Sequence, residues 1–204
     1  WNNPPMTDLT TPLRNWLARQ GTARSRDLVA KGLTRSQITR LKRAGVLVPV
    51  DRGVYALPDH QLGEHGAVAL VAGRKPEVVF CLLTALRLHD LTTQAPHEVW
   101  IAIANKDYPP RMTYPPLRTV RFSAQALVEG VETRKVDGVT IRLTNPARTV
   151  VDCFKFRNKI GLEVAIEALR EAYRDRHIRL DDLWRYARLQ RVANVMRPYL
   201  ESLA

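Results

Sequence analysis

Thr34 to Leu57 reads TRSQITRLKRAGVLVPVDRGVYAL, and this stretch decides the fold of the N-terminal part of the chain. Its first half has the spacing of a short helix, because Ile38 and Leu41 lie three residues apart and can face inward together. Thr34 is a favourable N-cap, and Gly45 can end the helix with a positive φ. The sequence therefore predicts a helix over residues 34–44.

This predicted helix carries four basic residues and no acidic one. By helical spacing, its outward positions are Arg35, Ser36, Thr39, Arg40 and Arg43. Guanidinium and hydroxyl groups suit phosphate oxygens and the edges of bases, so these residues are candidate DNA contacts. The alternative is an ordinary helix whose basic face is solvated.

The second half of the stretch predicts a β-hairpin. Residues 47–50 and 54–57 are apolar and rich in β-branched or aromatic side chains, with the turn Asp51-Arg52-Gly53 between them. A basic helix followed at once by a hairpin is typical of a winged helix-turn-helix. The helix would enter the major groove of DNA, and Arg52 at the hairpin tip could reach the adjacent backbone or minor groove. The alternative is a plain helix and hairpin with a solvated basic face.

Two more helices are predicted before this stretch, over residues 8–20 and 25–31. Helices this short need tertiary packing to be stable. We expect a shared core made of Leu13, Trp16, Leu17, Leu28, Ile38, Leu41, Val46 and Tyr55. Together these segments predict a DNA-binding domain over residues 6–58.

The remainder of the chain, residues 62–204, is expected to form a larger α/β domain. Apolar runs predict strands over 99–104, 119–122, 132–136 and 139–143, and Asp137-Gly138 is a strong hairpin signal between the last two. We expect a small, mostly antiparallel sheet with helices on one side. From Asn145 onward, helical spacing predicts a C-terminal helical bundle. The predicted fold class is therefore α+β.

Charge and composition narrow the choice of partners. The 204 residues carry a net charge of +12, which favours a polyanion, with nucleic acid ahead of a membrane surface. The first 60 residues hold ten lysines and arginines against four aspartates, which is half of that net charge. No apolar run reaches the roughly 18 residues of a membrane span. Cys81 and Cys153 lie in apolar runs and suit buried thiols in a reducing cytoplasm, which is the expected location.

Other polar clusters each allow two interpretations. Arg148, Lys155, Arg157 and Lys159 form either a second basic surface or, with Asp152, an i,i+4 ion pair beside a solvated face. His89 beside Asp90 is interpreted as a structural histidine at a helix end, since no nucleophile has a recognisable spacing to it. Asp181-Asp182 suit the start of a helix better than a metal site.

No motif predicts catalysis or a bound cofactor. The five histidines lack metal-ligand spacing, and the chain has no glycine-rich phosphate loop. The Gly-Ser turn and Asp-x-Asp pair of a nucleotidyltransferase are also missing. We therefore expect no enzymatic activity, no catalytic residue, no metal and no cofactor.

Three segments carry a resemblance to a known family: GVYALP at residues 53–58, TALRLHDLT at 84–92 and NPARTVVDCFKFRNKIGLEVAIEALREAY at 145–173. They resemble the AbiE-type antitoxin family, AbiEi, of type IV toxin-antitoxin systems. The resemblance covers most of residues 7–204, and the last segment is its most specific part. It implies an N-terminal winged helix-turn-helix that binds inverted repeats in the promoter of its own operon. It also implies a C-terminal domain that counters a nucleotidyltransferase-like toxin in abortive infection, a form of phage defence.

Carried over by position, the family's DNA contacts fall on residues 35–43, which adds Gln37 and Lys42 to the outward positions, and on Arg52. The resemblance implies an autoregulatory repressor whose partners are double-stranded DNA and the toxin, without a stable antitoxin–toxin complex. The protein would act on DNA as a monomer or a cooperative pair. Two other hypotheses remain open: a nucleic-acid-processing enzyme, and a scaffold that uses the C-terminal domain to block the toxin by direct contact.

Overall fold

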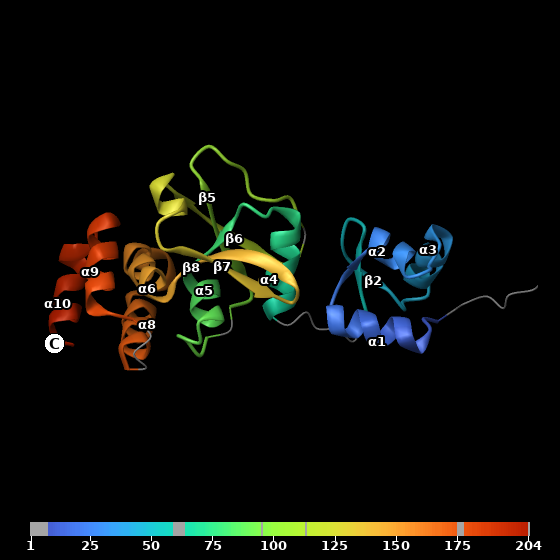
Figure 1. The fold of residues 1–204 in the computed structure, drawn as a ribbon, viewed down its shortest axis with the longest axis horizontal. Helices are drawn as coiled ribbons and strands as arrows, with labels where there is room; N and C mark the ends of the chain where they lie inside the picture. Colours follow the sequence, from blue (N-terminus) through green and yellow to red (C-terminus); the bar gives the residue numbers. More distant parts are fainter. Residues whose placement is uncertain (1–7, 59–63, 95, 113, 175–177, 204) are drawn as a thin grey trace, which may run out of the picture.

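The computed structural model describes residues 8–58, 64–94, 96–112, 114–174 and 178–203. The described residues form both helices and strands, so the fold is α+β as predicted. Two bodies are visible in Figure 1, a smaller one formed by residues 8–58 and a larger one formed by residues 64–203. The larger body contains two clusters of buried apolar side chains, and the smaller body contains a third.

The smaller body consists of three helices and a three-stranded antiparallel sheet of order β1-β3-β2. Its elements are α1 (Thr11–Gln20), β1 (Ala23–Arg24), α2 (Ser25–Ala30), α3 (Arg35–Arg43), β2 (Val48–Asp51) and β3 (Val54–Ala56). The predicted core residues Leu13, Leu17, Leu28, Ile38 and Leu41 are all buried. Trp16, Val46 and Tyr55, also predicted, are partly buried and pack against this core.

The larger body is built on a five-stranded sheet of order β6-β5-β4-β8-β7. Its strands are β4 (Val79–Phe80), β5 (Val99–Ala104), β6 (Leu117–Phe122), β7 (Val131–Val136) and β8 (Val139–Thr144). The pairs β5–β6 and β4–β8 are parallel, whereas β4–β5 and β7–β8 are antiparallel. The predicted mostly antiparallel sheet is therefore wrong, and the sheet is mixed. The connection between β5 and β6, about a dozen residues, is long enough to bring the chain back for parallel pairing.

Helices cover both faces of this sheet, which corrects the expectation of helices on one side. Alternate residues of β5 divide between the faces: Ile101 and Ile103 join one buried cluster, and Trp100 and Ala102 join the other. The first cluster is completed by α4 (Glu64–Arg74). This explains why β5 is apolar at every position, since a strand that is covered on both faces has no solvated side.

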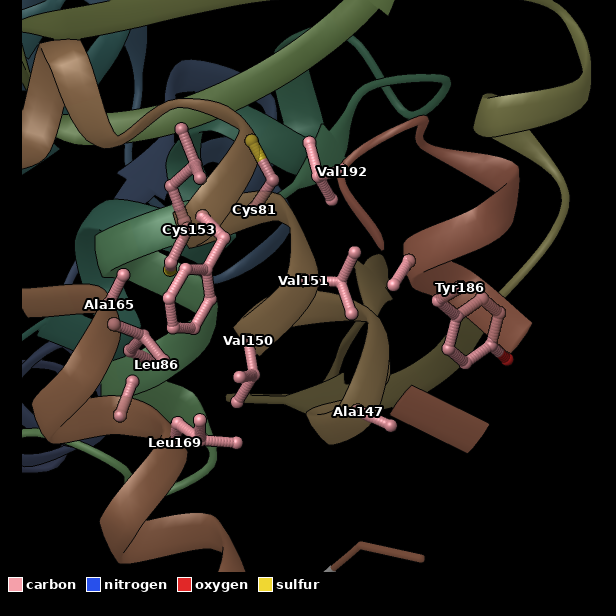
Figure 2. Close-up of a cluster of buried hydrophobic side chains, with 14 of the residues drawn as sticks. Cys81, Leu86, Ala147, Val150, Val151, Cys153, Ala165, Leu169, Tyr186 and Val192 are labelled. Carbon is pink, nitrogen blue, oxygen red and sulfur yellow. The ribbon is translucent and has the colours of Figure 1, made fainter. Parts of the chain in front are cut away.

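The second face is covered by the helices that follow the sheet in the chain, together with α5 (Leu82–Leu88). The later helices are α6 (Pro146–Lys155), α7 (Arg157–Ile160), α8 (Leu162–Arg174), α9 (Leu180–Leu189) and α10 (Ala193–Glu201). Figure 2 shows α6 at the centre of this cluster, with Val150 and Val151 among side chains from α5, α8 and α9. Cys81 and Cys153 are both buried as free thiols, as predicted.

Candidate nucleic-acid interface

Helix α3 begins and ends as its sequence predicts. Thr34 is the N-cap, and its Oγ1 accepts a hydrogen bond from the backbone N–H of Gln37 at 3.2 Å. In return, Gln37 Oε1 accepts from the backbone N–H of Thr34 at 2.7 Å, which completes a capping box. Gly45 follows the helix with φ of +71°, a conformation that favours glycine. The orientation of the basic side chains is thus fixed by a helix with defined ends.

The buried face of α3 consists of Ile38 and Leu41, which are 3% and 0% exposed. The four basic residues of α3 that were predicted to contact DNA lie on the exposed remainder of the helix: Arg35, Arg40, Lys42 and Arg43. Within the part of the chain that the structure describes, none of these four forms an ion pair with a carboxylate. In Figure 1, α3 lies on the side of the smaller body that faces away from the larger one.

The polar residues of α3 are partly engaged within the helix itself. Thr39 Oγ1 donates to the backbone carbonyl of Arg35 at 3.1 Å, and Ser36 Oγ lies 3.0 Å from Thr34 Oγ1. Gln37 is half-buried in the capping box described above. A base contact by Gln37 would therefore require its side chain to leave the cap, whereas the four cations can reach outward without such a change.

Arg52 lies on the tight turn between β2 and β3, where Gly53 has φ of +73°. Its side chain is exposed, as predicted for a hairpin tip. It lines a cleft of about 400 Å³ whose opposite wall comes from the larger body, including Gly73, Arg74 and Asp137. No residue of α3 lines this cleft, and α3 lies on the side of the smaller body that faces away from the larger one (Figure 1), so the structure does not bring Arg52 together with the other predicted DNA contacts.

The second basic surface proposed from sequence must be corrected at Arg148. This side chain is 0% exposed, so it cannot belong to any surface. Its Nε donates to Asp152 Oδ1 at 2.9 Å, and its other nitrogens donate to the carbonyls of Ala126 and Glu129. The predicted i,i+4 pair is present, but it is buried rather than solvated. Burial is possible because the guanidinium also lies over the ring of Phe122, 5.1 Å from its centroid.

The other three residues of that predicted surface lie together where α6 ends and α7 begins. Lys155 Nζ donates to Gln190 Oε1 at 2.5 Å, and Arg157 Nη1 donates to the carbonyl of Phe154 at 3.0 Å. The ammonium groups of Lys155 and Lys159 lie 5.8 and 5.7 Å from the ring centroid of Phe156. These contacts are typical of cations that stabilise a helix junction and cover an aromatic ring.

His89 occupies the structural position that was predicted for it, at the C-terminal end of α5. It is buried, its Nε2 lies 2.7 Å from the carbonyl of Thr144, and its Nδ1 lies 3.0 Å from Arg134 Nη2. A carbonyl only accepts and a guanidinium only donates, so Nε2 carries the proton and Nδ1 accepts. Burial lowers the pKa of His89 below its ordinary value, which agrees with this neutral form.

The Thr144 carbonyl that His89 contacts belongs to a polar network that continues into residues 145–149. Thr149 Oγ1 donates to the carbonyl of Asn145, and the hydroxyls of Thr144 and Thr149 lie 2.7 Å apart. Asn145 caps α6, its Oδ1 accepting from the backbone N–H of Arg148 at 2.9 Å. These side chains join the end of β8 to the start of α6, so their contacts are structural.

The acidic pair that was predicted to begin a helix lies at the start of α9. Asp181 and Asp182 lie in the first turn of α9, where the helix dipole favours them, as predicted. Across the described residues, no group of three or more His, Cys, Asp or Glu side chains could hold a metal ion. Among the helices described, none is both long and apolar enough to cross a membrane.

Sequence reasoning missed the basic residues that line the cleft beside Arg52, namely Arg24, Arg26 and Arg74. Arg24 and Arg26 belong to the basic N-terminal part, but Arg74 lies about 50 residues further on. The excess of basic residues in the first 60 positions indicated a positively charged N-terminal part, but it could not show which arginines lie close together in the fold.

Comparison with known families gives a match within the smaller body. Residues 12–58 match the model of a family described as "Transcriptional regulator, AbiEi antitoxin". The match contains all of α2, α3 and the β2–β3 hairpin, and it confirms the resemblance to AbiEi antitoxins for this segment. No curated protein matches the chain.

Proposed function

We propose that this protein, whose residues 12–58 match the AbiEi antitoxin family of transcriptional regulators, represses its own operon by binding inverted repeats in the promoter. In this proposal residues 6–58 act as a winged helix-turn-helix domain. Helix α3 enters the major groove, and the β2–β3 hairpin is the wing. Residues 62–204 then form the antitoxin domain that counters a nucleotidyltransferase-like toxin.

The observation that carries the proposal is the exposed, purely basic face of α3. Arg35, Arg40, Lys42 and Arg43 are held by a capped helix and have no carboxylate partner among the described residues. An arginine can bind guanine or phosphate through two parallel hydrogen bonds, so these side chains suit both base reading and backbone contact. Within α3 we assign the main contacts to these cations rather than to Gln37, because Gln37 is engaged in the cap.

The direct test is a gel-shift assay with the duplex that lies upstream of the protein's own gene. We expect Arg40→Ala/Arg43→Ala to weaken binding by about 100-fold, since each lost base or phosphate contact costs about 1–3 kcal/mol. The matched control is Arg170→Ala/Arg197→Ala, which removes the same charge from exposed positions on α8 and α10. Unchanged binding in the α3 variant would show that α3 is not the recognition helix.

The antitoxin role needs a separate test. Coexpression with the nucleotidyltransferase-like product of the adjacent gene should restore growth, and the two proteins should not copurify as a stable complex. Rescue by the α3 variant Arg40→Ala/Arg43→Ala would show that toxin control is independent of repression. A stable stoichiometric complex would instead favour the scaffold hypothesis.

We further propose that the protein has no enzymatic activity of its own. The contacts of Arg148, Asp152 and His89 are those of buried structural groups, which leaves them poorly placed to reach a substrate. Incubation with DNA and RNA in the presence of Mg²⁺ or Mn²⁺ tests this directly. Metal-dependent cleavage that copurifies with the protein would favour the enzyme hypothesis.

A further inference from the structure

A cleft of about 400 Å³ lies where the smaller body meets the larger one. Four arginines from three separate segments line it: Arg24, Arg26, Arg52 and Arg74. We call it the arginine cleft. Arg24 Nη2 crosses between the two bodies and donates to the carbonyl of Gly73 at 2.5 Å, so the two walls are joined by a direct hydrogen bond.

The charge of the arginine cleft favours an anion. Its lining contains four guanidiniums and two carboxylates, Asp27 and Asp137. Arg74 Nη2 also donates to the backbone carbonyl of Arg111 at 3.3 Å, so a phosphate at Arg74 would share this guanidinium with a neutral acceptor. The distance from Arg26 Nε to Asp27 Oδ1 is 3.5 Å, which is long for an ion pair, and 76% of the Arg26 side chain is exposed. This weak pair leaves most of the guanidinium accessible to a ligand. Guanidinium groups match phosphate oxygens with two parallel hydrogen bonds, which makes a phosphate group the best-suited anion.

The lining of the same cleft also contains apolar side chains. They come from both bodies and are Val54, Ala69, Leu70 and Val139. Gly53 and Gly73 add no side chain to the lining, and their carbonyls already accept hydrogen bonds from Ser25 and Arg24. A cavity of this volume lies within the usual range for small-molecule sites, about 300–1,000 Å³. A ligand that carries both a phosphate and a flat, weakly polar group would use both kinds of lining.

We propose that the arginine cleft binds a nucleotide, with its phosphates against Arg26 and Arg74 and its base against the apolar side chains of the lining. Phosphate could come from a free nucleotide or from the backbone of DNA. The structure favours the free ligand, because no residue of α3 lines the cleft and α3 lies on the opposite side of the smaller body (Figure 1). This site is independent of the proposed promoter binding and would be present even if that proposal failed.

Isothermal titration calorimetry of the full chain at low salt tests the site, with ATP, GTP, tripolyphosphate and adenosine as probes. We expect ATP or GTP to bind more tightly than tripolyphosphate, and adenosine not to bind measurably. Arg26→Ser/Arg74→Ser should weaken nucleotide binding by about tenfold or more, because two charge-assisted contacts are lost. The control Arg170→Ser/Arg197→Ser removes the same charge elsewhere and should leave the affinity unchanged.

A variant that is expected to tighten nucleotide binding completes the test, because a folding defect would weaken binding. Asp137 lies at the rim with φ of +48°, a conformation that asparagine tolerates, so Asp137→Asn removes a negative charge with little strain. We expect it to tighten nucleotide binding a few-fold. Equal affinity for ATP and tripolyphosphate would overturn the nucleotide assignment. Displacement of ATP by a short duplex, with the same dependence on Arg26 and Arg74, would overturn the free-ligand assignment, and equal effects of the cleft and control variants would overturn the site.

Discussion

His89 is held as a neutral imidazole by a carbonyl on one side and a guanidinium on the other. Protonation would turn Nδ1 into a donor facing the Arg134 donor, and burial already lowers the pKa of His89. The unfolded chain, in contrast, takes up this proton near pH 6.5. We therefore expect the free energy of unfolding to fall as the pH is lowered from about 7 to about 5, because the unfolded state binds more protons in this window.

Chemical denaturation at several pH values measures this effect. His89→Gln keeps a donor for the Thr144 carbonyl but cannot titrate, so its unfolding free energy should lose this part of the pH dependence. His65→Gln, at an exposed position on α4, is the matched control and should follow the parent protein. The assignment of His89 fails if the two variants give the same pH profile.

Arg148 and Asp152 are fully buried, and Asp152 Oδ2 has no hydrogen-bond partner among the described residues. Burial raises the pKa of Asp152 to about 6 although Arg148 lowers it, so desolvation outweighs the attraction within the pair. We expect Asp152→Leu to cost about 3–5 kcal/mol, because it leaves a buried guanidinium without its carboxylate. The double variant Arg148→Met/Asp152→Leu should be more stable than either single variant.

Urea unfolding of the four proteins gives the coupling energy directly. Asp181→Leu is the control, because Asp181 is exposed and its contact to Arg179 is long at 3.7 Å; it should change stability by about 0.5 kcal/mol or less. Additive effects at residues 148 and 152 would contradict the pairing. The i,i+4 spacing was sufficient to predict this pair, but not its burial, which depends on carbonyls of Ala126 and Glu129 supplied by a distant loop.

At the scale of single elements, the cap of α3 determines how the basic residues are presented. Thr34 Oγ1 accepts a hydrogen bond from the backbone N–H of Gln37, and Gln37 Oε1 accepts one from the backbone N–H of Thr34. Thr34→Ala should therefore lower the free energy of unfolding by about 1 kcal/mol. Thr39→Ala is the control, because Thr39 lies in the exposed middle of the same helix and makes only a local bond to Arg35. Urea unfolding that ranks the two variants in the reverse order would contradict the cap.

Elements that depend on local signals were predicted well from the sequence. Residues 34–45 contain their own cap, apolar stripe and glycine stop, and Asp137-Gly138 forms a turn with positive φ at both positions, as type I′ hairpins require. Strand β5 was also located correctly, but its partners were not. Its parallel pairing with β6 and the insertion of β4 beside β8 are set by contacts between distant segments, which no local pattern encodes.

At the scale of the whole molecule, the arginine cleft could not be predicted from sequence. Arg24, Arg52 and Arg74 are spread over about 50 residues, and each has an ordinary basic environment in the sequence. They come together only because the hairpin turn of the smaller body meets α4 and the β7–β8 turn of the larger one. The net charge of +12 indicated a polyanionic partner, but it did not distinguish this cleft from the face of α3.

The salt dependence of DNA binding distinguishes two cases: DNA that contacts α3 directly, and DNA that is attracted by the net charge of the whole chain. Each phosphate neutralised releases counterions and contributes about −0.9 to the slope of log K against log salt concentration. Arg40→Ala removes a charge from the proposed interface and should make the slope shallower by about one, whereas Arg170→Ala removes the same charge from α8 and should leave it unchanged. Fluorescence anisotropy with the upstream duplex over a salt series measures both slopes. If the two variants shift the slope equally, binding depends on net charge alone, and α3 is not a specific DNA-binding surface.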